Sequence, residues 1–229
     1  MWIKICGITS LQDAETAVAA GANSIGFVFA ESPRRMTPEA VREITASLPK
    51  TLEKIGVFVN ASFDEMAAAC RVAGLTGLQL HGSVRGFHSQ HLRDSNADLT
   101  RVLQVVGYHA DPKAFALDLR TLRDSSPGEE DAVLVDTWFE GKLGGMGRSF
   151  DWPAARNIFL REAPYLRLIA AGGLNPENVR EAIQTLHPWG VDVSSGVEKS
   201  PGKKDSGRVA AFIRAARAAE TELMETARA

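Results

Sequence analysis

Short apolar runs alternate with longer amphipathic segments from one end of the chain to the other. The apolar runs have the length of buried strands, and the segments between them have apolar residues at the spacing of a helix that packs one face against a core. The strands are predicted at residues 2–6, 24–29, 53–59, 77–80, 101–106, 132–136, 167–171 and 191–193. The pattern therefore predicts eight strand–helix units in series.

Several of the predicted helices begin with residues that commonly cap a helix N-terminus. They are Ser10 with Asp13, Thr37 with Pro38, Ser62 with Glu65, and Asn175 with Pro176. The Ser, Thr or Asn side chain can accept a hydrogen bond from a free N–H of the first turn, and Pro suits the first helical position because it has no N–H to leave unpaired. A last helix is predicted from about Asp205, and the residues beyond about 217 are expected to form a helical C-terminal tail.

Eight strand–helix units in 229 residues fit a single-domain α/β fold, the closed (β/α)8 or TIM barrel, whose usual size is about 250 residues. An open, doubly wound sheet is the alternative. That fold usually has a Gly-rich dinucleotide-binding loop after its first strand, and residues 6–9, CGIT, are not such a loop. The most polar segment, residues 123–131, is too short to link two domains. We therefore expect residues 1–229 to form one barrel domain.

The composition argues against several kinds of partner. Hydrophobic residues make up 45% of the chain and charged residues 24%, with a net charge of -2 at pH 7. Because Lys and Arg are scattered among the acidic residues, no nucleic-acid partner is expected. No apolar run approaches the roughly 20 residues that a membrane span needs, so no membrane association is expected.

The cysteines and histidines indicate neither a disulfide nor a metal site. The two cysteines, Cys6 and Cys70, and the lack of a leader with a basic end and an apolar core predict a protein of the reducing cytoplasm without a disulfide. His88 and His91 are three residues apart on a polar segment, but no Cys or carboxylate cluster accompanies them, so no metal site is expected.

Cys6 stands where the first predicted strand ends. A cysteine in an apolar strand is most often a small buried hydrophobic residue. The two-residue alternation of a strand places Cys6 with Trp2 and Lys4 on one face, and Ile3 and Ile5 on the other. Helices cover the outer face of a barrel strand, which assigns the isoleucines to that face and Cys6 to the interior. Because the active site of such barrels lies at the carboxyl ends of the strands, Cys6 is a candidate catalytic residue.

Asp136 ends the sixth predicted strand and would lie on the same rim of the barrel. An aspartate in this place can also simply cap a turn, and the spacing alone does not decide between the two interpretations. The segment after it contains Gly144, Gly145 and Gly147, which could fold over a ligand. A Gly-rich loop alone is weak support for a site.

Two further loops predict a phosphate site. Gly172-Gly173 follows the seventh strand and Ser195-Gly196 follows the eighth, each close to a predicted helix start. Exposed backbone N–H groups and helix N-termini bind phosphate, and barrels commonly hold phosphate between these two loops. Either loop alone would be interpreted as a tight turn, but the pair favours phosphate.

Other polar residues lie near the predicted rim. Arg34 and Arg35 follow the second strand, where one of them could meet an anionic substrate group while the other is solvated. Asn60, Gln79 and His81 follow the inward alternation of the third and fourth strands. Buried polar side chains in a barrel mouth commonly hydrogen-bond one another, so these three are expected to shape the site.

Eight motifs, read in order, carry a resemblance that covers essentially the whole chain. They are KICGIT, GFVFAESPRR, GVFVN, LQLHG, VDTW, GGMGRSFDW, AAGGLNPENVREAI and GVDVSSGVEKSPGKKD. In order and spacing they resemble the phosphoribosylanthranilate isomerases of tryptophan biosynthesis. The resemblance implies an Amadori rearrangement of N-(5-phosphoribosyl)anthranilate to 1-(2-carboxyphenylamino)-1-deoxyribulose 5-phosphate, without a cofactor.

The resemblance also implies roles for individual residues. Cys6 would be the general base, Asp136 the general acid, and Arg34 the contact to the anthranilate side of the substrate. The other implied substrate-binding residues are Gln79, His81 and Asp192, and the implied phosphate-binding residues are Gly145, Gly172, Gly173, Ser195 and Gly196. The acid would protonate the furanose ring oxygen and the base would remove the C2 proton. We expect the thiol to have a pKa lowered toward neutrality and the carboxyl to have a raised one.

One departure and three rival functions accompany this resemblance. Met146 stands where the family more often has Thr or Ser, which puts a side-chain hydrogen bond there in doubt. A related sugar isomerase of histidine biosynthesis would have Asp in place of Cys6. A non-catalytic phosphate-binding barrel would be expected to lose the acid or the base, and a Cys-nucleophile hydrolase would need a rim His and oxyanion donors beside the thiol. A phosphosugar is the expected partner, and the protein would be a monomer or a homodimer.

Overall fold

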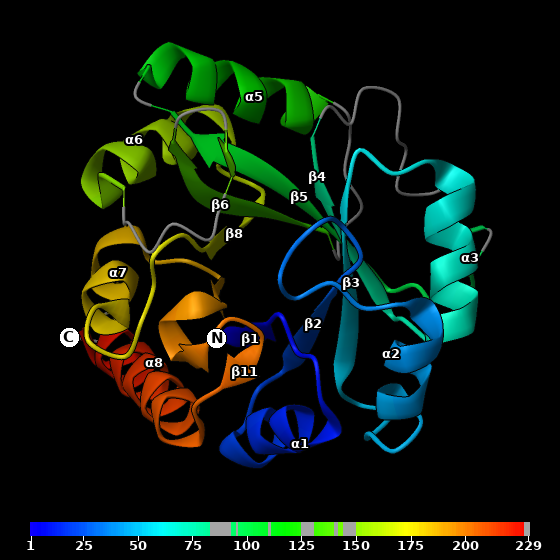
Figure 1. Cartoon of the computed structure of the whole chain (residues 1–229). Coiled ribbons are helices and arrows are strands. Elements are labelled where there is room, and N and C mark those ends of the chain that lie inside the picture. The colour runs from blue at the N-terminus through cyan, green and yellow to red at the C-terminus, as the bar shows by residue number, and fades with distance from the viewer. Residues whose placement is uncertain are drawn as a thin grey trace.

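Eight parallel strands of the computed structural model close into a barrel (Figure 1). The structure describes residues 1–82, 93–94, 96–109, 111–124, 131–139, 142–143 and 150–226. The barrel strands are β1 (Trp2–Cys6), β2 (Ser24–Val28), β3 (Glu53–Val59), β4 (Gly77–His81), β5 (Arg101–Tyr108), β6 (Ala132–Phe139), β8 (Arg167–Ala170) and β9 (Gly190–Val193). They pair in the order β5-β4-β3-β2-β1-β9-β8-β6, and β5 pairs with β6 to close the ring. The predicted fold class, a (β/α)8 barrel, is confirmed.

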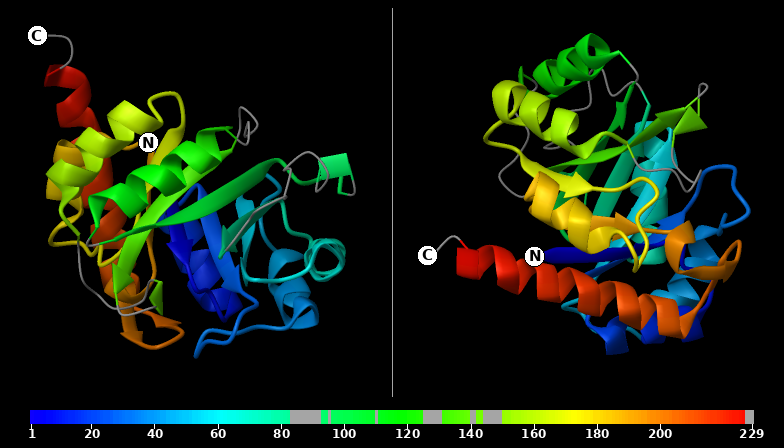
Figure 2. Two further views of the ribbon diagram at one scale, coloured as in Figure 1. Left: turned by 90° about the horizontal axis from the view of Figure 1, so that it is seen from above. Right: turned by 90° about the vertical axis from the view of Figure 1, so that its left-hand side faces the viewer.

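Helices surround the barrel in all three ribbon views (Figures 1 and 2). Within the described residues they are α1 (Leu11–Ala20), α2 (Pro38–Thr45), α3 (Phe63–Ala73), α5 (Pro112–Asp124), α6 (Trp152–Glu162), α7 (Val179–Leu186) and α8 (Ser206–Thr226). The shorter elements are β7 (Lys142–Leu143), the one-turn 3-10 helix η1 (Ser195–Val197), and the hairpin of β10 (Glu198–Ser200) and β11 (Lys203–Lys204). Each of the eight predicted strands is present, and β5 and β6 run past their predicted ends.

The helix starts follow the capping residues closely. The side chains of Ser10 and Thr37 accept the expected N–H bonds, and Ser62 forms a full capping box with Glu65. The start predicted at Asn175 is three residues too early, because the helix proper begins at Val179. Asn175 still caps the turn before that helix, where its Oδ1 accepts from the N–H groups of Glu177 and Asn178.

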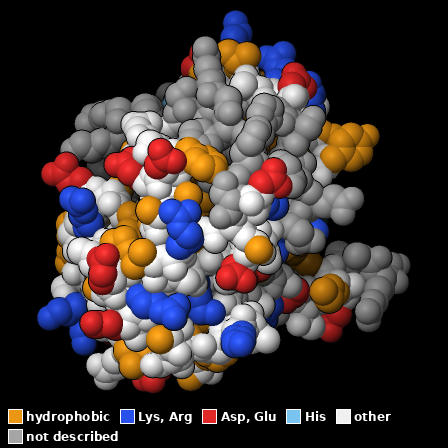
Figure 3. Space-filling view, turned by 90° about the vertical axis from the view of Figure 1, so that its right-hand side faces the viewer, with side chains coloured by type: hydrophobic (Ala, Val, Ile, Leu, Met, Phe, Trp, Pro, Cys, Tyr) orange, Lys and Arg blue, Asp and Glu red, His pale blue; other side chains and the backbone are white. Residues whose placement is uncertain are grey.

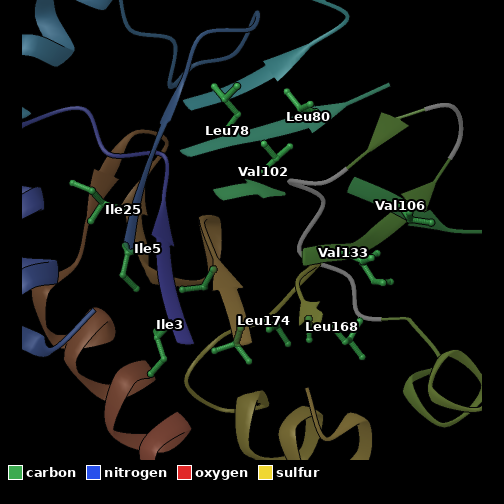
Figure 4. Close-up of a cluster of buried hydrophobic side chains, with 14 of the residues drawn as sticks. Ile3, Ile5, Ile25, Leu78, Leu80, Val102, Val106, Val133, Leu168 and Leu174 are labelled. Atoms are coloured by element: carbon green, nitrogen blue, oxygen red, sulfur yellow. The ribbon is translucent and has the colours of Figure 1, made fainter. Parts of the chain in front are cut away.

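Buried apolar side chains form two layers. The outer layer lies between the strands and the helices and includes Ile3 and Ile5 of β1 (Figure 4). The inner layer fills the barrel and consists of Trp2, Ile55, Leu103, Val105, Ala132, Leu134, Ile169 and Ala171. The alternation predicted for β1 is therefore confirmed. Lys4 follows Trp2 on the inner face of β1 and is buried. Gln79, Asp136 and Asp192 are also buried polar residues, and they belong to the candidate site.

The surface shows mixed character. On the face seen in Figure 3, Lys and Arg side chains lie among Asp, Glu and apolar ones, without a continuous basic stripe among the atoms that are not grey. Of the helices in the described segments, none combines the length and apolar character that crossing a bilayer requires.

Candidate active site

Cys6 is the last residue of β1, and its side chain is buried. The chain turns sharply after it, because Gly7 has a φ of 75° and the N–H groups of Gly7 and Ile8 both donate to the Gly26 carbonyl at 2.9 Å. A side chain at Gly7 would be strained in this conformation, and its Cβ would lie 2.6 Å from Arg34 Cδ. The glycine therefore allows Arg34 to lie beside the carboxyl end of β1.

Three of the predicted substrate-binding residues share one hydrogen-bonded network with Lys4. Lys4 Nζ donates to Gln79 Oε1 at 2.7 Å and to Asp192 Oδ1 at 2.9 Å. Gln79 Nε2 lies 2.8 Å from His81 Nε2. Burial, assisted by the Lys4 charge, lowers the pKa of His81 to about 4, so its ring is neutral at pH 7. The network supplies polar groups from β1, β4 and β9 to the barrel interior.

Asp136 lies buried within β6 and is held by its own neighbour in the chain. The N–H of Thr137 donates to its Oδ1 at 2.6 Å. Burial is the main reason that the pKa of Asp136 is raised to about 7, with Asp192 adding to the shift and the Thr137 N–H and Lys4 opposing it. The raised pKa agrees with the expectation for a general acid. Gly172 lies directly against this carboxyl, since a Cβ there would be 2.8 Å from Oδ1.

The Cys6 thiol differs from the expectation. Burial raises its pKa above the ordinary value, and this effect outweighs the opposing attraction of Lys4. The predicted lowering toward neutrality is therefore wrong for the protein without substrate, because the inward position that makes Cys6 a candidate also removes it from water. Cys6 and Cys70 are both free thiols, as expected.

Arg34 forms part of an ion-pair cluster at the rim. Its Nε and Nη2 donate to the two carboxylate oxygens of Glu198 at 2.8 and 2.7 Å, and this bidentate pair raises the pKa of the guanidinium further. Lys204 Nζ donates to Glu198 Oε1 at 2.9 Å, to the Ser194 carbonyl at 3.2 Å, and to the Cys6 carbonyl. Glu198 and Lys204 thus connect Arg34 to the backbone of Cys6.

The two predicted phosphate loops are in contact and line one hollow. Gly173, Ser195 and Gly196 belong to its wall, together with Leu174, Asn175, Glu198 and Arg208. A Cβ on Gly196 would clash with the carbonyl oxygen of Leu174, so only glycine allows this close approach. Arg208 Nε donates to the Gly196 carbonyl at 2.9 Å and Asn178 Nδ2 to the Gly173 carbonyl at 3.0 Å. Asn178, which precedes α7, and Arg208 of α8 therefore each fix the backbone of the loop before them.

Several predicted residues lie elsewhere or outside the described part. Asn60 is exposed and has a φ of 50°, because it follows the end of β3 at Val59, and the inward face of β3 carries odd-numbered residues such as Ile55. Gly145, with the neighbouring Met146, and the pair His88 and His91 lie outside the described residues.

Sequence reasoning assigned no role to Lys4, Glu198 or Lys204. Lys4 carried a usable signal, since a lysine on the inward face of a buried strand needs a buried partner. Glu198 and Lys204 lie in the GVEKSPGKKD segment but carry no comparable periodic signal, because a hairpin brings them to the rim.

Known proteins resemble this chain over most of its length. The family model described as N-(5'phosphoribosyl)anthranilate (PRA) isomerase matches residues 3–215. An N-(5'-phosphoribosyl)anthranilate isomerase of Rubrobacter xylanophilus is 38% identical over 94% of this chain and 98% of its own length.

Two solved structures are similar over 95% of this chain and 99% of their own. The crystal structure of phosphoribosyl anthranilate isomerase from Thermotoga maritima has a TM-score of 0.78 and 36% identity. A phosphoribosyl anthranilate isomerase in complex with reduced 1-(o-carboxyphenylamino)-1-deoxyribulose 5-phosphate has a TM-score of 0.76 and 34% identity. The chain belongs to the N-(5'-phosphoribosyl)anthranilate isomerase family.

Proposed function

We propose that this protein converts N-(5-phosphoribosyl)anthranilate to 1-(2-carboxyphenylamino)-1-deoxyribulose 5-phosphate in tryptophan biosynthesis, with Asp136 as general acid and Cys6 as general base. The observation that carries the assignment of roles is the pair of buried titratable groups on β1 and β6 of one barrel interior. The pKa of Asp136 is raised to about 7, which keeps a proton available near neutral pH.

The reaction needs one proton to be delivered and one to be removed. The Asp136 carboxyl protonates the furanose ring oxygen, the C1–O bond breaks, and the nitrogen lone pair forms the C1=N bond of a Schiff base. The Cys6 thiolate then takes the proton from C2, and the C–H electron pair becomes the C1=C2 bond of an enolamine while the nitrogen becomes neutral. The enolamine gives the ketose product when C1 is protonated and the C2 hydroxyl loses its proton, so that the C2=O bond forms. No step requires an electron acceptor.

The remaining residues bind the two anionic ends of the substrate. The phosphate is bound between the loops that contain Gly172-Gly173 and Ser195-Gly196. Glu198 occupies the Nε–Nη2 edge of Arg34, so the edge formed by Nη1 and Nη2 is the one that can pair with the anthranilate carboxylate.

We propose an oligomeric state and a cellular compartment as well. The active unit is a monomer or a homodimer that works in the cytoplasm, which is supported by the two free thiols.

The decisive experiment is a direct assay of the purified protein with freshly made phosphoribosylanthranilate. Loss of the anthranilate-type fluorescence with enzyme-dependent kinetics is the expected result. A protein that is folded by circular dichroism but leaves the fluorescence decay at the rate of the spontaneous reaction would contradict the proposal. The phosphoribosyl substrate of histidine biosynthesis serves as the control for specificity, and we expect no turnover of it.

A further inference from the structure

The proposed mechanism leaves one buried charge without a role. Lys4 is 0% exposed and lies in the middle of the barrel. A buried ammonium costs several kcal/mol unless it is paired and hydrogen-bonded. Burial alone would lower the pKa of Lys4, but the attraction of Asp192 and Cys6 raises it, so the side chain is charged at pH 7. A charge that is maintained at this depth calls for an explanation.

Two acceptors on other strands fix the position of this ammonium. Asp192 of β9 lies 2.9 Å away and Gln79 of β4 lies 2.7 Å away. Asp192 is also the register partner of Lys4 in the β1–β9 pair. An ammonium has three N–H donors, and these two bonds use two of them. One donor is left for a group at the rim.

Cys6 is the group toward which the side chain extends. The two residues lie on the same face of one strand, with Cys6 nearer the rim. Gly26 of β2 is the register partner of Cys6, and a Cβ there would be 2.7 Å from Cys6 Sγ and 3.0 Å from Lys4 Cε. Both atoms therefore converge on the space that the glycine leaves open, and the attraction between the two side chains raises the pKa of Lys4.

The other charged groups near Cys6 either form ion pairs with other residues or carry a negative charge, which does not stabilise a thiolate. Lys204 of β11 and Arg34 after β2 both pair with Glu198. His81 of β4 is neutral at pH 7. Asp192 of β9 and Asp136 of β6 are carboxyl groups, and an ionised carboxylate disfavours a neighbouring thiolate. Lys4 is thus the cation of this group whose free donor faces the thiol.

We propose that Lys4 is a positioning residue for Cys6, whose ammonium, held by Asp192 and Gln79, stabilises the thiolate that accepts the C2 proton. This inference rests on the proposed role of Cys6 as the base. The proton passes from C2 to Sγ, the C–H electron pair enters the enolamine, and the negative charge leaves the sulfur, so Lys4 contributes before and during proton removal. Asp192 has the opposite effect, because it competes with the thiolate for the same ammonium.

The test is a titration of the Cys6 thiolate by its ultraviolet absorbance, without substrate. A Cys70→Ala background leaves one thiol, and the Cys6→Ala/Cys70→Ala protein serves as the blank. Lys4→Met should raise the apparent pKa of Cys6 by at least about one unit, the usual effect of removing one close opposite charge. Asp192→Asn should lower it. Lys4→Met/Asp192→Asn, which buries no unpaired charge, should show a smaller rise, because Lys4 affects the thiol more strongly than Asp192 does.

Opposite shifts from the two partners of one ion pair distinguish this role from a structural one. Thermal unfolding of each variant identifies any that fails to fold. If a single variant fails, the thiol pKa is compared between the parent protein and the charge-neutral double variant. An unchanged thiol pKa in the double variant, or a rise in Asp192→Asn, would overturn the inference. Because no substrate is present, the expected shifts together with an inactive parent protein would reject the proposed function and leave the role of Lys4 toward the thiol intact.

Discussion

At the scale of single residues, burial acts on the candidate acid and base in the same direction but with different consequences. It raises the pKa of both Asp136 and Cys6. For a general acid a raised pKa is useful, because the carboxyl keeps its proton near neutral pH. For a general base it is a cost, which Lys4 offsets in part. The two residues therefore need different surroundings within the same barrel mouth.

The first prediction concerns these two side chains directly. Cys6→Ala and Asp136→Asn should each fold and should each reduce turnover by at least about 10²-fold, which is the usual contribution of a positioned acid or base. Steady-state assays give the turnover, and circular dichroism confirms the fold. Turnover close to that of the parent protein in either variant removes that residue from the mechanism.

The raised pKa of Asp136 predicts how stability depends on pH. The ordinary pKa is 3.8 and the folded value is about 7, so folding binds a proton between these values. The stability that this carboxyl contributes is complete below about pH 4 and is lost as the pH rises through about 7. Asp136→Asn keeps a neutral side chain at every pH. Relative to the parent protein it should therefore gain stability between pH 5 and 8, by up to about 3 kcal/mol.

Urea unfolding of both proteins at pH 5 and at pH 8 provides the measurement. The difference in unfolding free energy between variant and parent should move in favour of the variant at pH 8. A difference that stays constant across this range would show that Asp136 titrates near its ordinary value.

The neighbouring arginines provide a matched pair of variants. Arg34→Lys should lower kcat/KM by about thirtyfold, because lysine cannot reproduce either the bidentate bond to Glu198 or a second one to the substrate carboxylate. Arg35→Lys should be close to neutral, since Arg35 is exposed, whereas Arg34 is partly buried in its pair with Glu198. Kinetic measurements at one fixed ionic strength compare the two. Damage from Arg35→Lys instead would move the carboxylate contact to that residue, and two silent variants would place it elsewhere.

At the scale of elements, the site depends on how the loops after β8 and β9 meet. Gly196 approaches the Leu174 carbonyl so closely that a methyl group has no room. The loops are further joined by Arg208 of α8, which bonds the Gly196 carbonyl at 2.9 Å and the Glu177 carboxylate of the other loop at 3.0 Å. Their relative position is therefore set by a backbone contact that a single added carbon would disturb.

Gly196→Ala should weaken phosphate binding more than it affects the chemical step. Inorganic phosphate should compete with the substrate in the parent protein, and its inhibition constant and the substrate KM should both rise about tenfold or more in the variant, with a smaller change in kcat. Gly207→Ala in α8 is the control, because an added Cβ there meets only the Asp205 carboxylate oxygen, at 3.2 Å. Phosphate that alters kcat alone, or equal effects of the two substitutions, would place the phosphate site elsewhere.

Elements also show what a sequence can predict. Strand positions and three of the four capped helix starts follow from alternation and from local capping, because those signals act over a few residues. Cys6 and Asp136 could be proposed because the apolar pattern places each at the end of a predicted strand. The partners of Lys4, the Arg34–Glu198 pair and the bond from Lys204 to the Cys6 carbonyl could not, since they join residues 75 to 198 positions apart that only the closed barrel brings together.

At the scale of the whole molecule, the last helix contacts both ends of the barrel, with Arg208 near the site and Arg217 at the opposite end. Helix α8 lies beside β1 (Figure 2), and Arg217 on it bonds the Met1 carbonyl and Asn23 Oδ1. Asn23 Oδ1 also accepts from the N–H of Ile3 at 3.0 Å. Arg217 therefore connects α8 to the start of β1 and to the segment that leads into β2, whereas the candidate site lies at the opposite, carboxyl ends of these strands.

This separation predicts that stability and catalysis can be changed independently. Arg217→Ala should lower the free energy of unfolding by about 1–2 kcal/mol, because the buried end of β1 loses a charged hydrogen-bond donor, while kcat/KM stays within about twofold. Arg180→Ala is the matched control, since this more exposed arginine of α7 pairs only with Glu222 within the described part of the chain. Its loss should cost no more than about 0.5 kcal/mol. Urea unfolding and steady-state kinetics on the same preparations make the comparison. Equal losses of stability would mean that the contact to β1 adds nothing beyond a surface ion pair, and a loss of kcat/KM in Arg217→Ala would mean that the two ends of the barrel are coupled through β1.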